Sequence, residues 1–516
     1  MVDQEEKVMK KPNVLYIMCD QFRFDCINAL GNTIIQTPNL DRLVKRGRAY
    51  TNAYSSCPVC VPARYVIRTG KEPYNLGCYC NESPDPIYTD GSNGVESYCG
   101  EYLARRMKKL GYYTFGIGKF HTSPDPYEEL GYDVQIHTEE LYDTPEIRAK
   151  DGFAAYIQNE HPEYAHLEQL HGERTNMYFV PQMSGMPAEH TVEGFVAKKT
   201  VEQLELLEQE DKPFFGFVSF VGPHPPCAPP IPYNRMYDPD GMPNPVRGNA
   251  YTDSMDEQIA WMNYLIYADD INDTWARNWK TRYYGEISYI DDCIGKILDK
   301  VEARSDADNT IICFFSDHGE MAGDHGGWQK ESFFEESVKI PFLVSYPAKW
   351  KGGEIVNDLV SLTDLYGIAT TAAGESDLRD GVNLLEDEKR EVLFATYGRP
   401  GSNQFKMMVR KGKWKYIYMA NGGRRQLFDL DYDPHELKNL VTKEKEISVE
   451  MHKILTEKCK SEPGLEAVIS NGEIYAVPYT PRKLERLHQF DFSKKITDYT
   501  VPSGCEYMSA ALQLEE

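Results

Sequence analysis

The chain has 516 residues, with 56 Lys and Arg against 80 Asp and Glu, and therefore a formal net charge of −24. This acidic balance argues against a nucleic-acid partner, because phosphate backbones are bound by basic patches. A small anionic substrate is not excluded, since it responds to the local field of its pocket. The length predicts a large domain together with a smaller one.

The sequence has neither the pattern of a membrane protein nor that of a secreted disulfide scaffold. No run of 18 or more apolar residues occurs, and residues 1–7 lack the apolar core of a signal peptide. Twelve cysteines in a chain of this length are too sparse for a disulfide framework and are expected to be small buried thiols. We therefore expect a cytoplasmic protein with no membrane partner.

The first predicted strand is the apolar run 13–19, which follows Pro12. Asp20 comes at its carboxyl end, where open α/β sheets place ligand-binding groups. We interpret Asp20 as the first ligand of a metal ion. The alternative reading, a helix cap or turn residue, would be favoured if the chain lacked a partner carboxylate.

A helix is predicted to begin at Thr37-Pro38, with Thr37 as its cap and Pro38 in the first helical position. It leads to the most specific segment of the chain, residues 57–70. In this segment Cys60-x-Pro62-x-Arg64 is followed by Thr69-Gly70. Pro62 can open a second helix, which would place Cys60 just before a positively polarised terminus, and Arg64 adds a fixed charge. Both features favour an anion beside Cys60.

Two other interpretations of the cysteines are open. Cys57-x-x-Cys60 has the spacing of a redox dithiol, and with Cys78 and Cys80 it could supply four thiolates to a structural zinc. Such a chain would be a non-catalytic zinc-binding protein. This interpretation leaves the Pro, Arg and Thr-Gly positions of the segment unexplained.

The Cys60 segment resembles the signature of the type I sulfatases, in the alkaline phosphatase superfamily. The resemblance implies that Cys60 is oxidised to formylglycine by a maturase, and that the hydrated aldehyde acts as the nucleophile on a divalent metal. One of its hydroxyls attacks sulfur, and the other later loses its proton and expels sulfate. The substrate would be a small anionic sulfate ester.

Two further blocks follow predicted strands and resemble elements of the same family. Gly118-Lys119-Phe120-His121 comes after the strand that begins at Tyr113, and His224 comes after the strand 214–220. The resemblance implies that Lys119 contacts the sulfate, that His121 assists proton transfer, and that His224 assists departure of the alcohol. A solvated lysine and hydrogen-bonded histidines are the alternative reading of these residues.

The third predicted strand, 310–316, ends in Asp317-His318, which we interpret as the remaining metal ligands. The family often has a second Asp after the first one, whereas this chain has Gln21, so the second ligand is an amide oxygen or is missing. The resemblance favours calcium. An oxygen-rich site with one imidazole also leaves manganese, magnesium and zinc open.

The last element of the predicted site is the block 323–330, Gly-Asp-His-Gly-Gly-Trp-Gln-Lys. By resemblance its final residue, Lys330, binds the sulfate and the leaving-group oxygen. Two segments without a recognised pattern, 123–193 and 227–267, are expected to select the substrate. The stretch 473–516 also has no recognised pattern and is expected to wrap the core or to form contacts between copies of the chain.

The predicted fold class is α/β, an alkaline-phosphatase-like mixed sheet flanked by helices, with a smaller C-terminal α+β subdomain. We expect a catalytic domain at 1–385 and, at 386–516, a subdomain with a small antiparallel sheet and a helix near 447–459. A homo-oligomer is left open.

The predicted function is hydrolysis of a sulfate monoester, with sugar, aryl and choline esters all open. Asp20-Gln21 and Asp317-His318 also occur in phosphonate hydrolases of the superfamily, so a phosphonate or phosphodiester hydrolase is the second candidate.

Overall fold

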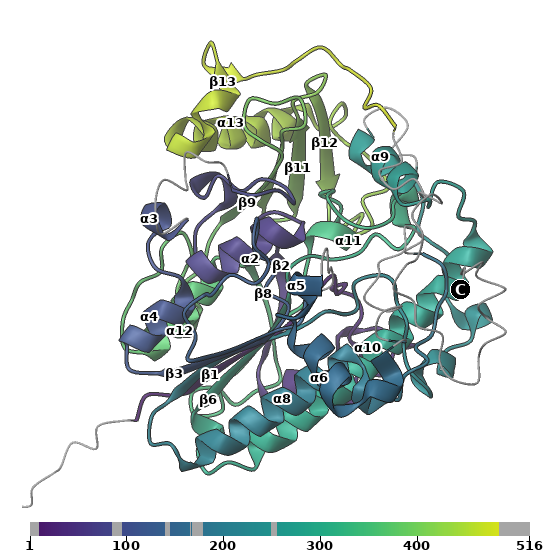
Figure 1. The fold of residues 1–516 in the computed structure, drawn as a ribbon. Helices are drawn as coiled ribbons and strands as arrows, with labels where there is room; N and C mark the ends of the chain where they lie inside the picture. The colour runs from purple at the N-terminus through teal and green to yellow at the C-terminus, as the bar shows by residue number, and fades with distance from the viewer. Residues whose placement is uncertain are drawn as a thin grey trace, which may run out of the picture.

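The computed structural model describes residues 10–84, 95–139, 145–165, 167, 179–248 and 255–484. Its centre is an eight-stranded sheet in the order β4-β3-β5-β1-β6-β7-β2-β8 (Figure 1). Only β7 runs antiparallel to its neighbours β6 and β2. The strands are β1 (Asn13–Cys19), β2 (Arg48–Tyr54), β3 (Tyr113–Gly118), β4 (Val134–His137), β5 (Phe214–Phe220), β6 (Thr310–Ser316), β7 (Phe342–Ser345) and β8 (Glu354–Ser361).

Helices cover both faces of this sheet, because the residues of its central strands are apolar on both sides. Along β1, Leu15 and Ile17 pack with α1, α8 and α10, whereas Val14 and Tyr16 pack with α2, α4 and α12. The helices are α1 (Pro38–Arg46), α2 (Cys60–Thr69), α3 (Glu96–Cys99), α4 (Leu103–Lys109), α5 (Pro145–Arg148), α6 (Gly152–Glu160), α8 (Val192–Leu206), α9 (Glu257–Leu265), α10 (Asp273–Glu302), α11 (Glu335–Val338), α12 (Asp364–Ala372) and α13 (Lys445–Ser461).

A second, smaller sheet forms the C-terminal subdomain, with α13 packed against it at the top of Figure 1. Its four strands are antiparallel, in the order β12-β11-β10-β9. They are β9 (Val392–Tyr397), β10 (Lys406–Lys411), β11 (Trp414–Met419) and β12 (Arg424–Asp429); the short strands β13 (Ile469–Ser470) and β14 (Glu473–Ile474) form a separate pair. The predicted α/β class with a small C-terminal subdomain is confirmed, whereas the boundary at 385 stays a prediction.

Most predicted elements have the expected position. The strands predicted at 13–19, 214–220 and 310–316 are β1, β5 and β6 with identical bounds. The predicted capping role of Thr37 is wrong, because its side chain makes no capping hydrogen bond to α1. Asp291 of α10 takes that role, since its carboxylate accepts hydrogen bonds from the backbone N–H groups of Asn39 and Leu40 at 3.0 and 2.8 Å. In the part of the chain that the structure describes, no helix is both long and apolar enough to span a bilayer.

Buried charges join the small sheet to the rest of the molecule. Lys415 of β11 is fully buried, and its ammonium group lies 2.8 Å from a carboxylate oxygen of both Glu335 and Glu436. Glu335 stands at the start of α11, and its backbone N–H also donates to Glu436 at 2.7 Å. Glu436 has Lys415 as its cationic partner, and Glu335 has Lys415 together with Lys339 at 3.4 Å. These pairs connect the subdomain to the chain around the large sheet.

Replacing Lys415 with Met should lower the free energy of unfolding by about 3–5 kcal/mol, because the buried Glu436 would lose its ammonium partner and Glu335 the closer of its two. Urea denaturation followed by fluorescence measures the change. The matched control is Lys411→Met on the neighbouring strand, where water screens the exposed pair with Glu450 and the change in stability should be much smaller. Equal effects of the two substitutions would contradict the structural role of Lys415.

Candidate active site

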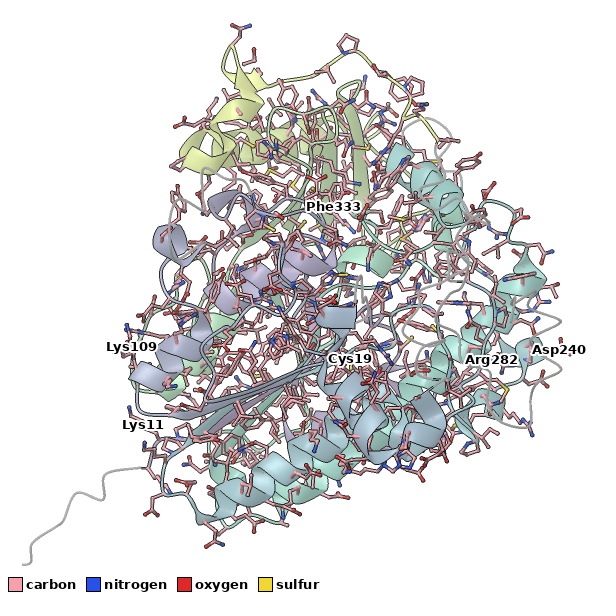
Figure 2. The ribbon with its side chains drawn as sticks, viewed as in Figure 1. Lys11, Cys19, Lys109, Asp240, Arg282 and Phe333 are labelled. Atoms are coloured by element: carbon pink, nitrogen blue, oxygen red, sulfur yellow. The ribbon has the colours of Figure 1, made fainter. Side chains whose placement is uncertain are left out.

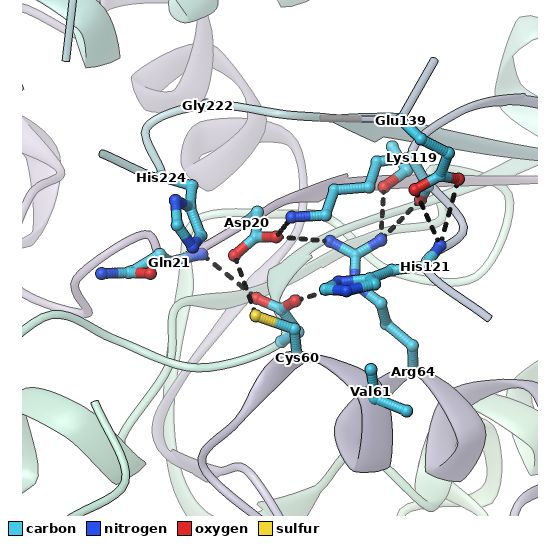
Figure 3. Close-up of polar contacts among 12 residues, drawn as sticks. Asp20, Gln21, Cys60, Val61, Arg64, Lys119, His121, Glu139, Gly222 and His224 are labelled. Atoms are coloured by element: carbon cyan, nitrogen blue, oxygen red, sulfur yellow. Dashed lines mark hydrogen bonds and ion pairs between the residues drawn. The ribbon is translucent and has the colours of Figure 1, made fainter. Parts of the chain in front are cut away.

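Four parallel strands end at one edge of the large sheet and deliver polar side chains to one place. Asp20 follows β1, Lys119 follows β3, His224 lies beyond β5, and Asp317 follows β6. These strands are neighbours in the sheet order, so their carboxyl ends meet. Figure 3 shows Asp20, Lys119 and His224 converging on Cys60.

Cys60 is the first residue of α2, and the preceding Val59 is extended, with φ −159° and ψ 147°. Pro62 lies within the first turn, as predicted, although Cys60 is inside the helix and not just before it. The thiol therefore sits at the positively polarised end of a ten-residue helix, only 1% exposed. This position suits a group that must carry or attract negative charge.

Asp20, Cys60, Asp317 and His318 form a buried group whose potential ligand atoms all lie within 4.8 Å of one another. The Sγ atom of Cys60 is 3.1 Å from Nε2 of His318 and 3.8 Å from Oδ1 of Asp20. Nδ1 of His318 is 3.0 Å from the carbonyl oxygen of Gly319, which orients the ring so that Nε2 faces the group. Two carboxylates and one imidazole fit a divalent cation.

Gln21, the predicted amide ligand, lies beside this group in a left-handed backbone conformation with φ 65°. Its side-chain oxygen accepts a hydrogen bond from Lys330 at 2.8 Å, and its side-chain nitrogen donates to Glu320. Glu320 is therefore a site residue that the sequence analysis missed, although it belongs to the same Asp317-His318-Gly319-Glu320 run. A metal contact of Gln21 stays a prediction.

Arg64 is held between the two carboxylates of the site. Its Nε atom is 3.0 Å from Asp317, and its Nη2 atom is 3.0 Å from Asp20. Nη1 donates to the carbonyl oxygen of Lys119 at 2.5 Å and to Ser219 at 3.1 Å. These contacts give Arg64 a positioning role, since its planar fork fixes both carboxylates. Direct contact of Arg64 with a sulfate group stays a prediction.

Two lysines add positive charge around the thiol. Lys119 lies 2.5 Å from Asp20, and Lys330 donates to Sγ of Cys60 at 2.9 Å. Lys330 is also 2.9 Å from Nε2 of His224, whose Nδ1 atom lies 2.7 Å from the carbonyl oxygen of Pro225. Since Nδ1 is held by a carbonyl, Nε2 is the ring nitrogen of His224 that faces the site.

The charges around Cys60 favour its thiolate form. Burial and the carboxylate of Asp20 oppose ionisation, but Lys330 and His318 outweigh them and lower the pKa of Cys60 to about 7. Asp20 likewise has a pKa well below its usual value, because Lys119, His224 and Arg64 together overcome the effect of its burial. The site therefore stabilises negative charge on two different groups.

His121 lines the cavity that opens from Cys60, and its backbone is held by a residue that the sequence analysis missed. Its backbone N–H donates to the carboxylate of Glu139 at 3.1 Å, and the backbone N–H of Phe120 donates to the same group at 2.7 Å. Glu139 follows β4, in a segment with no recognised motif, so no local signal pointed to it. It fixes the turn that carries Lys119 and His121 (Figure 3).

The four-thiolate zinc site does not form. In the described part of the chain, the groups of three or more convergent His, Cys, Asp or Glu ligand atoms include neither Cys57, Cys78 nor Cys80. Burial also raises the pKa of Cys57 and that of Cys78, which opposes the thiolate form that zinc requires. Cys60 instead belongs with carboxylates and an imidazole.

A cavity of about 460 Å³ opens from Cys60 toward solvent, which is a typical size for a small-molecule site. Of the two segments predicted to select the substrate, 227–267 contributes Trp261, Met262, Leu265 and Ile266 to its wall. No described residue of the segment 123–193 lines it, and parts of both segments lie outside the described residues. A further wall residue, Arg482, comes from the C-terminal stretch.

Comparisons with known proteins agree with these features. The family model described as Sulfatase matches residues 12–374, and one described as N-sulphoglucosamine sulphohydrolase, C-terminal, matches residues 323–461. The chain is 30% identical over 453 residues to an arylsulfatase of Clostridium perfringens, covering 84% of this chain and 91% of the relative. It is 28% identical over 455 residues to a choline-sulfatase of Rhizobium meliloti, covering 83% of this chain and 82% of the relative.

Solved structures share the fold. The phosphonate monoester hydrolase of Agrobacterium radiobacter superposes with a TM-score of 0.69 at 24% identity, covering 87% of this chain and 96% of that one. At this identity the likeness shows an alkaline-phosphatase-like fold alone.

The unmodified Cys60 thiol should react with iodoacetamide with a midpoint near pH 7, because the thiolate is the reactive form and its pKa is lowered. Reactivity should fall as the pH decreases below 7 and level off above it. Peptide mass spectrometry of metal-free protein at a series of pH values measures this.

Cys80 provides an internal control for the alkylation, since it lines the same cavity but burial raises its pKa to about 12. Lys330→Met should move the midpoint of Cys60 upward. A Cys60 midpoint near 9 in the unaltered chain would contradict the electrostatic account.

A bound divalent cation should stabilise the fold by about 2.7 kcal/mol at a hundredfold excess over its dissociation constant. Asp317→Asn should largely remove this gain, whereas Asp299→Asn, an exposed carboxylate on α10, should retain it. Thermal unfolding with calcium, manganese, magnesium or zinc checks the effect and ranks the metals. Equal stabilisation of the two variants would place the cation elsewhere.

Proposed function

Because the chain belongs to the sulfatase family, we propose that it hydrolyses a sulfate monoester to an alcohol and inorganic sulfate, using a formylglycine made from Cys60 and a divalent cation. The observation that carries this proposal is the convergence of Cys60, Asp20, Asp317 and His318, with Lys330 beside the thiol. We propose calcium as the metal, since two carboxylates supply hard oxygen ligands. A maturase must supply the oxidation of Cys60.

The formylglycine and the divalent cation would each make a defined chemical contribution. A hydrated formylglycine supplies one hydroxyl that can attack sulfur and another whose proton loss can expel sulfate. A divalent cation held by Asp20, Asp317 and His318 supplies positive charge that lowers the pKa of a nearby hydroxyl. The chain's own residues must do the rest, which is to hold the ester, spread its charge and move protons.

Three cationic side chains prepare the site for an anionic ester. Lys330 lies in contact with position 60, and Lys119 reaches the same carboxylate as Arg64. All three are at least 94% buried, so their charges act in a poorly solvated environment where they are strongly felt. Arg64 holds the carboxylates in place. Each of the two lysines has a fixed side-chain position, because its ammonium group contacts a site residue at short distance.

His224 and Lys330 are placed to serve the departing alcohol. Nε2 of His224 and Nζ of Lys330 share one hydrogen bond of 2.9 Å, and both residues line the cavity that would receive the alcohol. A proton held between them can be delivered to the alcohol oxygen as the ester bond breaks. His121, which lines the same cavity on the Glu139-supported turn, is assigned proton transfer at the oxidised position 60.

A phosphonate or phosphodiester hydrolase is the second candidate. It is favoured by Gln21, which brings an amide where a carboxylate would add negative charge, and by His318 among the metal ligands. The same nucleophile and lysines could bind a phosphonate monoanion, because its charge and tetrahedral shape resemble those of a sulfate ester. Lys330 in contact with Cys60 serves both reactions, so the two candidates are separated by the ratio of the hydrolysis rates for matched sulfate and phosphonate substrates.

Coexpression with a formylglycine-generating maturase should yield a peptide containing position 60 that is lighter by about 18 Da, the difference between thiol and aldehyde. This protein should hydrolyse an aryl sulfate faster than the matching aryl phosphonate. Cys60→Ala should lose both activities by at least about 10³-fold, since it lacks the nucleophile.

Cys78→Ala is the matched control for the nucleophile, because this buried thiol lies outside the metal group and should be dispensable for chemistry. A faster phosphonate reaction would transfer the proposal to the second candidate. Full activity of the unmodified thiol form would refute the formylglycine mechanism.

A further inference from the structure

A C-terminal segment, residues 475–484, extends from the small sheet to the mouth of the cavity; we call it the strap. In Figure 1 it is the yellow coil that runs across the top of the molecule toward α9. Asn421 fixes it, because its side chain donates to the carbonyl oxygen of Thr480 and accepts from the N–H of Thr480, both at 2.9 Å. Val477 is paired with the backbone of Ala420 and Gly422 at 3.0 and 2.8 Å. The strap is therefore anchored two residues before Arg482.

Arg482 is the residue of the strap that reaches the cavity. Its guanidinium carbon lies 3.4 Å from the centre of the Trp261 ring on α9, a close cation–π contact. Nη1 donates a hydrogen bond to the side-chain oxygen of Gln258. Arg482 and Trp261 both line the cavity that begins at Cys60.

The charge of Arg482 is not matched by a carboxylate in direct contact. Within the described ranges, its hydrogen-bond acceptor is the neutral amide oxygen of Gln258, and no ion pair links it to an acidic side chain. Burial lowers the pKa of Arg482, and the more distant Tyr397, Glu331 and Asp256 offset this effect only in part. Arginine nevertheless keeps its proton at any physiological pH.

The acidic residue nearest in the cavity wall is already engaged. Glu331 is 7% exposed and accepts hydrogen bonds from the hydroxyl of Tyr397 at 2.8 Å and from the side-chain amide of Gln258. Gln258 therefore lies between Glu331 and Arg482, donating to the first and accepting from the second. Glu82, the other acidic residue of the wall, is exposed to solvent. A planar cation is thus presented to the space where the alcohol would lie.

We propose that Arg482, held against Trp261, binds a second anionic group on the alcohol, and that the preferred substrate is a sulfate ester of a carboxylated or otherwise anionic alcohol. The inference rests on the proposed function for the place of the ester, because the sulfate must lie at position 60 for the alcohol to reach Arg482. A guanidinium binds carboxylate and sulfate oxygens through two parallel hydrogen bonds.

The proposal disfavours one of the alcohols left open by the sequence. A choline ester would bring its quaternary ammonium into a cavity where the face of Trp261 is already covered by a guanidinium, and the two cations would repel each other. Neutral aryl and sugar alcohols would bind without using the charge of Arg482.

Binding to the Cys60→Ala chain tests this without depending on turnover. Isothermal titration calorimetry would compare 4-carboxyphenyl sulfate and 4-sulfophenyl sulfate with the neutral 4-carbamoylphenyl sulfate. At least one of the two anions should bind about tenfold to a hundredfold more tightly than the amide, as expected for charge-assisted hydrogen bonds. The better anion identifies a carboxylate or a sulfonated group as the partner.

Arg482→Gln in the same background should remove the preference for the anion and leave the affinity for the neutral amide within about twofold. Lys483→Ala is the matched control, since it removes an equal charge from the next, exposed position of the strap and should keep the preference. Arg482→Lys should restore only part of it, because an ammonium lacks the planar fork.

Equal affinity of the neutral and anionic compounds, or a preference that survives Arg482→Gln, would overturn the inference. These binding outcomes are separate from the test of the proposed function. If the mature enzyme released sulfate from none of the three compounds, the sulfatase reaction would be rejected. The binding preference of the Cys60→Ala chain could still be measured in that case.

Discussion

The whole site depends on two buried carboxylates, Asp20 and Asp317, being held close together. Their mutual repulsion and their loss of water would be costly if no cation accompanied them. Arg64 bridges both, and Lys119 adds a second ammonium group to Asp20. The neighbouring ends of β1 and β6 determine where the carboxylates stand, and α2 brings Arg64 and Cys60 together on one helical turn. The nucleophile position and its counter-charges are thus consequences of the same local geometry.

A second layer of residues orients the groups of this site. Glu320 holds the side chain of Gln21, and Glu139 holds the turn of Lys119 and His121. Backbone carbonyls hold the rings of His318 and His224. Such supports reduce the rearrangement that a reaction must otherwise induce. The arrangement also limits substitution, because these supporting carboxylates are themselves buried and would be costly to leave unpaired.

Much of the fold and the site could be predicted from the sequence, because the strands of a sheet buried on both faces are continuous apolar runs. The bounds of β1, β5 and β6 followed from such runs, and the residues after them converge since parallel strands share an edge. The sequence predicted Thr37 as the cap of α1, but Asp291, which is distant in the sequence, accepts the hydrogen bonds at the start of this helix. Glu139 and Arg482 had no local signature, since their roles arise from segments that only folding brings beside Lys119 and Trp261.

The strap also has a consequence for the order in which the molecule is built. Asp20, Cys60, Asp317, His318, Lys119 and Lys330 all lie in the first 330 residues, so the ribosome has synthesised every one of them once it reaches Lys330. Arg482 is synthesised much later, after the small sheet that anchors its segment through Asn421. Domains tend to fold as they emerge, from the N-terminal side first. The chemical centre can therefore take shape around an unfinished cavity, and Arg482 is the last residue to join the cavity wall.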